Sequence, residues 1–160
     1  MDKHSYVDDS IPVRYDSVMP AFHFLVSFLD EGGQEDIPFR DVSGFDSELQ
    51  VEEVVSGGEN GISYKLPKSV RCGNLKLSRA LRSDHVDSIA KWAEKAIQDF
   101  NITFKTVLVS VLNEKHEAVR TWRFSDAYPV KLSINELNAT KDELVIESLE
   151  LAFKYVKRDL

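Results

Sequence analysis

Residues Ala118–Ile134 read A-V-R-T-W-R-F-S-D-A-Y-P-V-K-L-S-I. The stretch holds two runs in which apolar and polar side chains alternate, and residues 125–127 separate them. The residues that share a face are Trp122 and Phe124 in the first run, and Val130, Leu132 and Ile134 in the second. Such alternation predicts two half-buried strands that meet at a Tyr-Pro corner. These side chains form no pattern typical of catalysis, so the most distinctive part of the chain is predicted to pair strands.

The composition indicates one folded domain. The chain has 160 residues, of which 42% are hydrophobic and 29% charged, and a domain usually takes about 100–200 residues. The formal charge of −7 argues against attraction of the whole surface to nucleic acid or anionic lipid. The single cysteine, Cys72, excludes an internal disulfide framework. We expect an N-terminal arm at residues 1–19 and the folded domain at residues 20–160.

The N-terminal residues lack an apolar core typical of a signal peptide. The longest apolar run, residues 22–29, is much shorter than the roughly 18 residues that a membrane-spanning helix needs. We therefore expect no signal peptide and no direct membrane anchor.

Further strands are predicted on both sides of this stretch. Alternating or apolar runs cover residues 22–28, 37–42, 47–55, 72–79 and 104–112. The last of these is apolar on nearly both faces, which is typical of a central strand. Gly44 is expected to turn the chain between two strands.

One amphipathic helix is predicted after Asp84, whose side chain can cap it, with Asp87 in its first turn. Its apolar residues at helical spacing are Val86, Ile89, Ala90, Ala93, Ile97 and Phe100. Residues 142–156 are ambiguous, because their apolar side chains fit either a helical stripe or one face of a strand. Glu147 interrupts the strand pattern, and Glu, Leu and Ala favour helix. Periodicity alone therefore slightly favours a helix here.

The sequence contains no recognisable catalytic, cofactor or metal site. The histidines His4, His23, His85 and His116 show no metal-ligand spacing. Cys72 has no evident base or orienting partner. The glycine pairs open no helix after a strand, so phosphate binding is unsupported. We expect a protein that is not an enzyme and needs no cofactor. The alternative, a small hydrolase or a small β-rich binding domain that recognises sugars, would need a concave site with converging polar groups, which no spacing here supplies.

A collinear set of segments instead resembles the inner tube proteins of contractile injection systems and contractile phage tails. The segments are P-A-F-H-F-L-V-S-F (20–28), F-R-D-V-S-G-F (39–45), E-L-Q-V-E-E with G-G-E-N (48–60), Y-K-L-P (64–67), G-N-L-K-L-S-R-A-L (73–81), V-S-V-L-N-E-K-H-E (109–117), W-R-F-S-D-A-Y-P-V-K (122–131), L-N-A (137–139) and I-E-S-L-E-L-A-F (146–153). Each piece alone is weak, but their uninterrupted order over residues 20–155 is specific. The chain departs from the family in its long N-terminal arm and in Arg79-Ala80-Leu81, where the family often has a glycine.

The resemblance implies a mainly β fold, in which two packed antiparallel sheets form a barrel-like body with one flanking helix. It implies that residues 144–153 form a strand. It also implies homo-hexameric rings that stack into a hollow tube, which a contracting sheath drives through a target membrane. Sheath, baseplate, spike and tube-terminator proteins are the implied partners, in a phage tail-like particle. The lumen would hold an effector protein in an injection system or DNA in a phage tail, and the agreement of residues 23–28, 57–60 and 146–153 modestly favours an injection system.

Three groups of residues are candidates for assembly. The polar face of Glu48, Gln50 and Glu52 is predicted to line the lumen or an interface. The loop at residues 56–68 is predicted to make ring-to-ring contacts; its candidates are Gly57, Gly58, Glu59, Asn60, Gly61, Lys65 and Lys68. The residues predicted to lie in the core or at a subunit seam are Trp122, Phe124, Tyr128 and Pro129.

Overall fold

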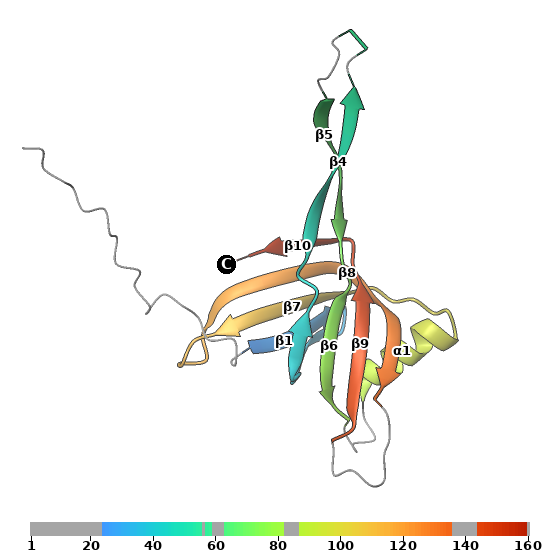
Figure 1. Cartoon of the computed structure of the whole chain (residues 1–160). Coiled ribbons are helices and arrows are strands. Elements are labelled where there is room, and N and C mark those ends of the chain that lie inside the picture. Colours follow the sequence, from blue (N-terminus) through green and yellow to red (C-terminus); the bar gives the residue numbers. More distant parts are fainter. Residues whose placement is uncertain (1–23, 56, 59–62, 82–86, 136–143, 160) are drawn as a thin grey trace, which may run out of the picture.

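The computed structural model describes residues 24–55, 57–58, 63–81, 87–135 and 144–159. The elements are β1 (Phe24–Asp30), β2 (Gly33–Ile37), β3 (Asp41–Ser43), β4 (Ser47–Val55), β5 (Ser63–Cys72), β6 (Leu75–Ala80), α1 (Ser88–Gln98), β7 (Lys105–Leu112), β8 (Ala118–Ile134), β9 (Ile146–Ala152) and β10 (Tyr155–Arg158). The body is an antiparallel sheet in the order β2-β1-β7-β8-β9-β6-β3, with β10 also paired to β8, and β4 and β5 form a separate hairpin (Figure 1).

The 17-residue strand β8 joins the two layers of the body. Its first part, from Ala118 to Ala127, pairs with β7, and its second part, from Tyr128 to Ile134, pairs with β9. Between them Asp126 has a φ of +52°, and a register shift follows between Pro129 and Lys131. Residues 125–127 are therefore a bend within one strand and not a break between two. This bend lets the sheet fold over so that its two halves enclose a common core.

The core lies between these layers and against α1. Its largest fully buried side chains are Phe28, Phe124, Leu75, Leu77, Leu151, Val26 and Val107. Trp92 of α1 meets Phe28 edge to face, with ring centroids 6.0 Å apart, and Phe124 meets Phe153 at 4.9 Å. The mainly β fold with one helix is confirmed for the described residues. The sheet does not close into a complete barrel, because β2 and β3 remain its two ends.

The helix begins later than predicted. Asp87 is the N-cap, and its side chain accepts a hydrogen bond of 3.1 Å from the Ala90 N–H, whereas Asp84 lies outside the described residues. The buried residues of α1 are Ile89, Trp92, Ala93 and Ala96. Ile97 and Phe100, which the helical pattern assigned to the apolar stripe, are 44% and 85% exposed. The prediction was wrong for these two because Trp92 and Ala96 set the buried face.

The ambiguous segment at residues 142–156 forms strands in its described part, as the resemblance implied and the helical count did not. Strand β9 pairs with both β6 and β8, and Glu147, Leu149 and Leu151 point into the core. Glu147 fits there because Arg79 of β6 donates hydrogen bonds to its carboxylate, at 2.9 Å from Nε and 2.7 Å from Nη2. Pairing with two neighbouring strands outweighs the helical propensity of the segment.

The other predicted strands are largely confirmed. Strand β7 is central, between β1 and β8, and β6 buries Leu75 and Leu77 as expected. The continuous strand predicted at residues 37–42 is wrong, because β2 ends at Ile37 and β3 begins at Asp41, with Pro38 between them. Gly44 turns the chain at a φ of +94°, where an added Cβ would lie 1.9 Å from the carbonyl oxygen of Asn74.

Candidate self-assembly surfaces

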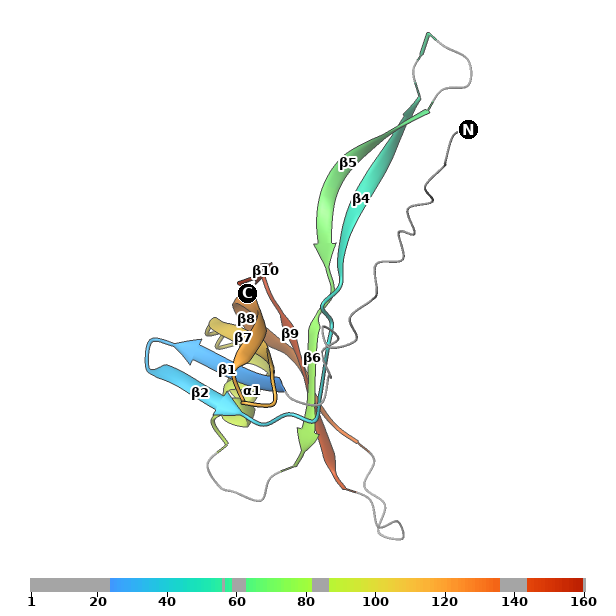
Figure 2. The ribbon, with the colours of Figure 1, turned by 90° about the vertical axis from the view of Figure 1, so that its left-hand side faces the viewer.

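The β4–β5 hairpin extends away from the body (Figures 1 and 2). Its large apolar side chains are 44–72% exposed: Leu49, Val51, Val54, Val55, Tyr64, Leu66 and Val70. An isolated two-stranded hairpin is marginally stable in water, and exposed apolar patches of this kind mark interaction sites. The hairpin is therefore a surface that another chain can cover.

The predicted polar face of Glu48, Gln50 and Glu52 lies on this hairpin. These residues alternate with Leu49 and Val51 along β4, so they share one side of the strand. Gln50 Oε1 accepts a hydrogen bond of 3.1 Å from the Ser69 hydroxyl, and Glu52 lies 3.8 Å from the Lys68 ammonium. Residues of β5 thus already contact two of these three polar side chains, Gln50 and Glu52.

The predicted loop at residues 56–68 is shorter than expected. Gly57 and Gly58 lie in an exposed turn beyond β4, while Glu59, Asn60 and Gly61 lie outside the described residues. Lys65 and Lys68 are part of strand β5, which corrects their assignment to the loop. The pattern of β5 is hard to see in sequence because Pro67 interrupts it and the register shifts opposite Gln50 and Val51.

The predicted core or seam residues divide into two kinds. Phe124 is fully buried, and Pro129 is buried opposite Leu151 of β9, so both belong to the core of one subunit. Trp122 and Tyr128 are only half-buried. The Tyr128 ring meets the exposed Phe104 edge to face at 5.7 Å. Only Trp122 and Tyr128 therefore remain candidates for a contact between subunits.

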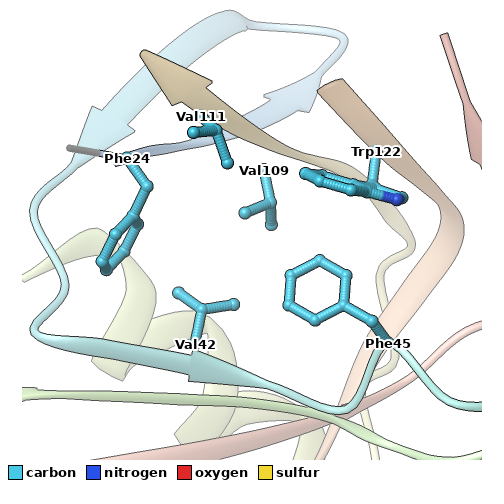
Figure 3. Close-up of a pocket in the computed structure, with 6 residues that line it drawn as sticks. All are labelled: Phe24, Val42, Phe45, Val109, Val111 and Trp122. Carbon is cyan, nitrogen blue, oxygen red and sulfur yellow. The ribbon is translucent and has the colours of Figure 1, made fainter. Parts of the chain in front are cut away.

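Trp122 lines an apolar cavity of about 240 Å³ that the sequence did not reveal (Figure 3). The lining residues are Phe24, Val42, Phe45, Val109, Val111 and Trp122. The ring of Phe45 meets Trp122 at 5.3 Å. Because every lining side chain is apolar or aromatic, the cavity suits an apolar side chain and offers no acid, base or metal ligand.

The layer formed by β8, β9, β6 and β3 presents polar side chains on the side away from the core. Ser148 of β9 stands between Ser78 and Ser133 in register, and its hydroxyl lies 3.1 Å from that of Ser78. In the next row Glu150 stands between Lys76 and Lys131, with 3.9 Å between the Lys131 ammonium and the Glu150 carboxylate. Short hydroxyls and long charged side chains thus lie in two parallel rows. Only the strand register brings these residues together.

The charged groups near the start of β7 make a structural contact. Lys105 donates a hydrogen bond to Asp30, and its ammonium lies 5.7 Å from the centroid of the Trp92 ring. The Lys105 hydrogen bond, with the N–H of Gly32, holds the pKa of Asp30 below its usual range.

Among the described residues no group of three or more His, Cys, Asp or Glu side chains could hold a metal ion. The helix in the described part of the chain is too short to cross a membrane.

Sequence comparison identifies a family for nearly the whole chain. The model of the T4-like virus tail tube protein gp19 family matches residues 20–157. A search of curated protein sequences gives no significant match.

Solved structures of tube assemblies share the fold. A chain of the anti-feeding prophage (AFP) baseplate is 27% identical, with a TM-score of 0.80 over 89% of this chain and 95% of that chain. A chain of the sheath-tube complex of PVC, an extracellular contractile injection system, is 26% identical, with a TM-score of 0.77 over 92% and 93%. Hcp1 from Flavobacterium johnsoniae is 17% identical, with a TM-score of 0.54 over 84% and 94%, and shows the fold alone.

Proposed function

This chain belongs to the T4-like virus tail tube protein gp19 family, and we propose that its copies close into six-membered rings that stack into the inner tube of a contractile injection system. The observation that carries the proposal is the projecting hairpin, whose apolar side chains no part of the described body covers. A hairpin of this kind gains stability when a neighbouring copy buries it.

The hairpin serves as the contact between stacked rings in this proposal. Seven large apolar side chains lie along it, and the polar row of Glu48, Gln50 and Glu52 lies beside them. The end of the hairpin where β4 ends and β5 begins lies far from the body (Figure 2). This row fits an interface better than a lumen, because the hairpin points away from the sheets of the body.

The polar face of β8, β9, β6 and β3 is our proposal for the wall of the lumen. Serine side chains are short, so a row of them protrudes little from the sheet. A wall of hydroxyl groups also has few apolar groups to which a cargo could adhere. Lys76 and Lys131 flank Glu150, and Asp41 stands opposite Ser78, so the positive and negative charges of this face balance, unlike those of the chain as a whole with its charge of −7.

The partners follow from the assemblies in which the relatives occur. Those relatives are chains of a baseplate, a sheath-tube complex and a tube-terminating cap. We extend these contacts to this chain, with sheath, baseplate, spike and terminator proteins as partners in a phage tail-like particle assembled in the bacterial cytoplasm. The tube domain at residues 20–160 agrees with the start of the family match at residue 20, and residues 1–19 remain a proposed arm.

The alternative function is the tail tube of a contractile phage, which conducts DNA, and the name of the matching family favours it. The similarity to the AFP and PVC assemblies at 26–27% identity favours an injection system that carries a protein effector. A β-rich binding domain outside the family is set aside, because the family model covers residues 20–157.

Electron microscopy of the full chain tests this function. We expect rings and tubes of uniform width, and tubes that become short when residues 57–61 are deleted while rings persist. A matched control replaces the same five positions with a Gly-Ser sequence of equal length and should still give long tubes. A wild-type chain that stays monomeric at high concentration would contradict the proposal.

A further inference from the structure

We propose that neighbouring copies within a ring are joined head to tail by Phe100 of one copy, which inserts into the apolar cavity beside Trp122 of the next copy. The inference rests on the proposed ring and names the contact that closes it. Two surfaces of the same chain carry it: an exposed aromatic side chain in the connection between α1 and β7, and a cavity toward the far end of β7.

Phe100 has a conformation that does not benefit the isolated subunit. It follows α1 with a φ of +53° and is 85% exposed. At this position after a helix the left-handed conformation normally belongs to glycine, because a Cβ is strained there. A strained backbone and a solvent-exposed phenyl ring both oppose the stability of the free chain. The side chain is therefore explained by a contact outside the subunit.

The turn that carries Phe100 is firmly held. The N–H groups of Asp99 and Asn101 both donate to the carbonyl of Lys95, at 3.2 and 3.0 Å. The Trp92 indole donates a hydrogen bond of 2.8 Å to the carbonyl of Thr103 on the returning chain. Phe100 is thus presented on an ordered support, which reduces the entropy lost when it binds.

The residue next to Phe100, Asp99, carries a negative charge, and Lys95 lies in the last turn of α1 before it. Asp99 is the C-cap of α1, where the negative end of the helix dipole disfavours a carboxylate. Asp99 forms no ion pair with any described residue. A carboxylate placed against the dipole beside a strained aromatic residue indicates a cationic partner outside the subunit.

The rim of the cavity is basic. Arg120 stands opposite Val111, and Arg158 stands opposite Trp122, so both arginines lie on the strand face that lines the cavity. Both are exposed, and neither makes an ion pair with a residue in the described ranges. An aromatic side chain next to Asp99 therefore matches the cavity in both polarity and charge.

The two surfaces suit a closed ring. Phe100 lies in the connection between α1 and the start of β7 at Lys105, whereas Val109 and Val111 of the cavity lie toward the other end of β7. Figure 1 shows α1 on one side of the body and the end of β7 on the other, while the hairpin points crosswise to both. A contact between two different surfaces of one chain closes into a ring when the rotation fits. The hairpin then remains free for stacking.

The first test is the Phe100→Gly variant of the full chain. We expect its ring fraction in analytical ultracentrifugation to fall at least tenfold. We also expect the melting temperature of the monomer to rise by roughly 2 °C, because glycine relieves the left-handed strain. The control Leu144→Ser removes a leucine that is 72% exposed elsewhere on the body and should leave the rings intact. Rings that persist in Phe100→Gly at the wild-type level overturn the proposal.

Charge reversal identifies the partner surface. Asp99→Arg and Arg158→Asp should each weaken ring formation, and the double variant should restore it. A mixture of Phe100→Gly with Arg158→Asp should give dimers at most, because each chain keeps one intact surface. Failure of the double variant to restore rings overturns the assignment of the rim.

The remaining outcomes distinguish two cases: a cavity that another segment or protein occupies, and a chain that forms no ring at all. Rings that persist in Phe100→Gly but disappear when residues 2–19 are deleted would assign the cavity to the N-terminal segment. Rings that persist in both variants would leave the cavity to a different protein, and both results overturn the inference. A wild-type chain that forms no ring under any condition would instead refute the proposed function.

Discussion

Arg79 shows how one residue can tie distant parts of the chain together. Its guanidinium, 5% exposed, donates to Glu147 of β9 and to Asp87, whose other carboxylate oxygen caps α1. It also lies 5.7 Å from the centroid of the Phe39 ring. One buried cation thus joins β6, β9 and the start of the helix, and each of its carboxylate partners has a hydrogen bond.

Replacing Arg79 should therefore be costly. In Arg79→Met the carboxylates of Glu147 and Asp87 lose their cation, and we expect the free energy of unfolding to fall by about 3–5 kcal/mol. Urea denaturation of the monomer measures the loss. The control Lys131→Met removes an exposed partner of Glu150 and should change the free energy by no more than about 1 kcal/mol. Equal effects of the two substitutions would show that Arg79 is not an essential buried cation.

The apolar side chains of the β4–β5 hairpin are not explained by the packing of a single subunit. Leu49 and Val70 stand opposite each other and are 58% and 66% exposed, so they contribute little to the core. The alternation in β4 predicted a strand with one apolar face, but the structure leaves that face without a cover in the described chain. The energetic value of the hairpin thus depends on a neighbouring molecule.

Polar substitution of this pair should separate folding from stacking. In the double variant Leu49→Ser, Val70→Ser we expect the melting temperature of the monomer to change by no more than about 2 °C, because both side chains are already in water. Tube length in electron micrographs should fall to single rings or short stacks. The double variant Leu81→Ser, Leu144→Ser removes two exposed leucines from the body and should stack normally. Long tubes from the hairpin variant would refute its role in stacking.

At the scale of the whole molecule, a body with its own core carries the projecting β4–β5 hairpin. The core of the body is closed by residues of one chain, so the monomer should fold alone, while no residue of the hairpin belongs to the described core and the hairpin should open locally. Lys65, Lys68 and Arg71 place trypsin sites on β5. Assembly should protect these sites without changing the body.

Limited proteolysis checks this expectation. Among the described residues, trypsin should cleave the monomer first at Lys65, Lys68 or Arg71, and assembled tubes should resist cleavage there by at least tenfold in rate, as read by mass spectrometry. Lys91 and Lys95 on α1 serve as internal controls, because the packed helix should resist in both states. Equal cleavage of β5 in monomers and tubes would show that assembly does not cover the hairpin.

The sequence by itself determined the strand character of Ala118–Ile134, the buried leucines of β6, the central position of β7 and the likeness to the tail tube family. These properties depend on the local alternation of apolar and polar side chains, which is present in each strand before it pairs with a neighbour. The bend in β8, the pairing of Arg79 with Glu147, the serine row and the cavity beside Trp122 were decided only by the tertiary structure. Arg79 and Glu147 are 68 residues apart, and no local pattern can report which strands become neighbours or in what register. Side-chain periodicity is a property of one strand, whereas a site made of several strands exists only after they pair.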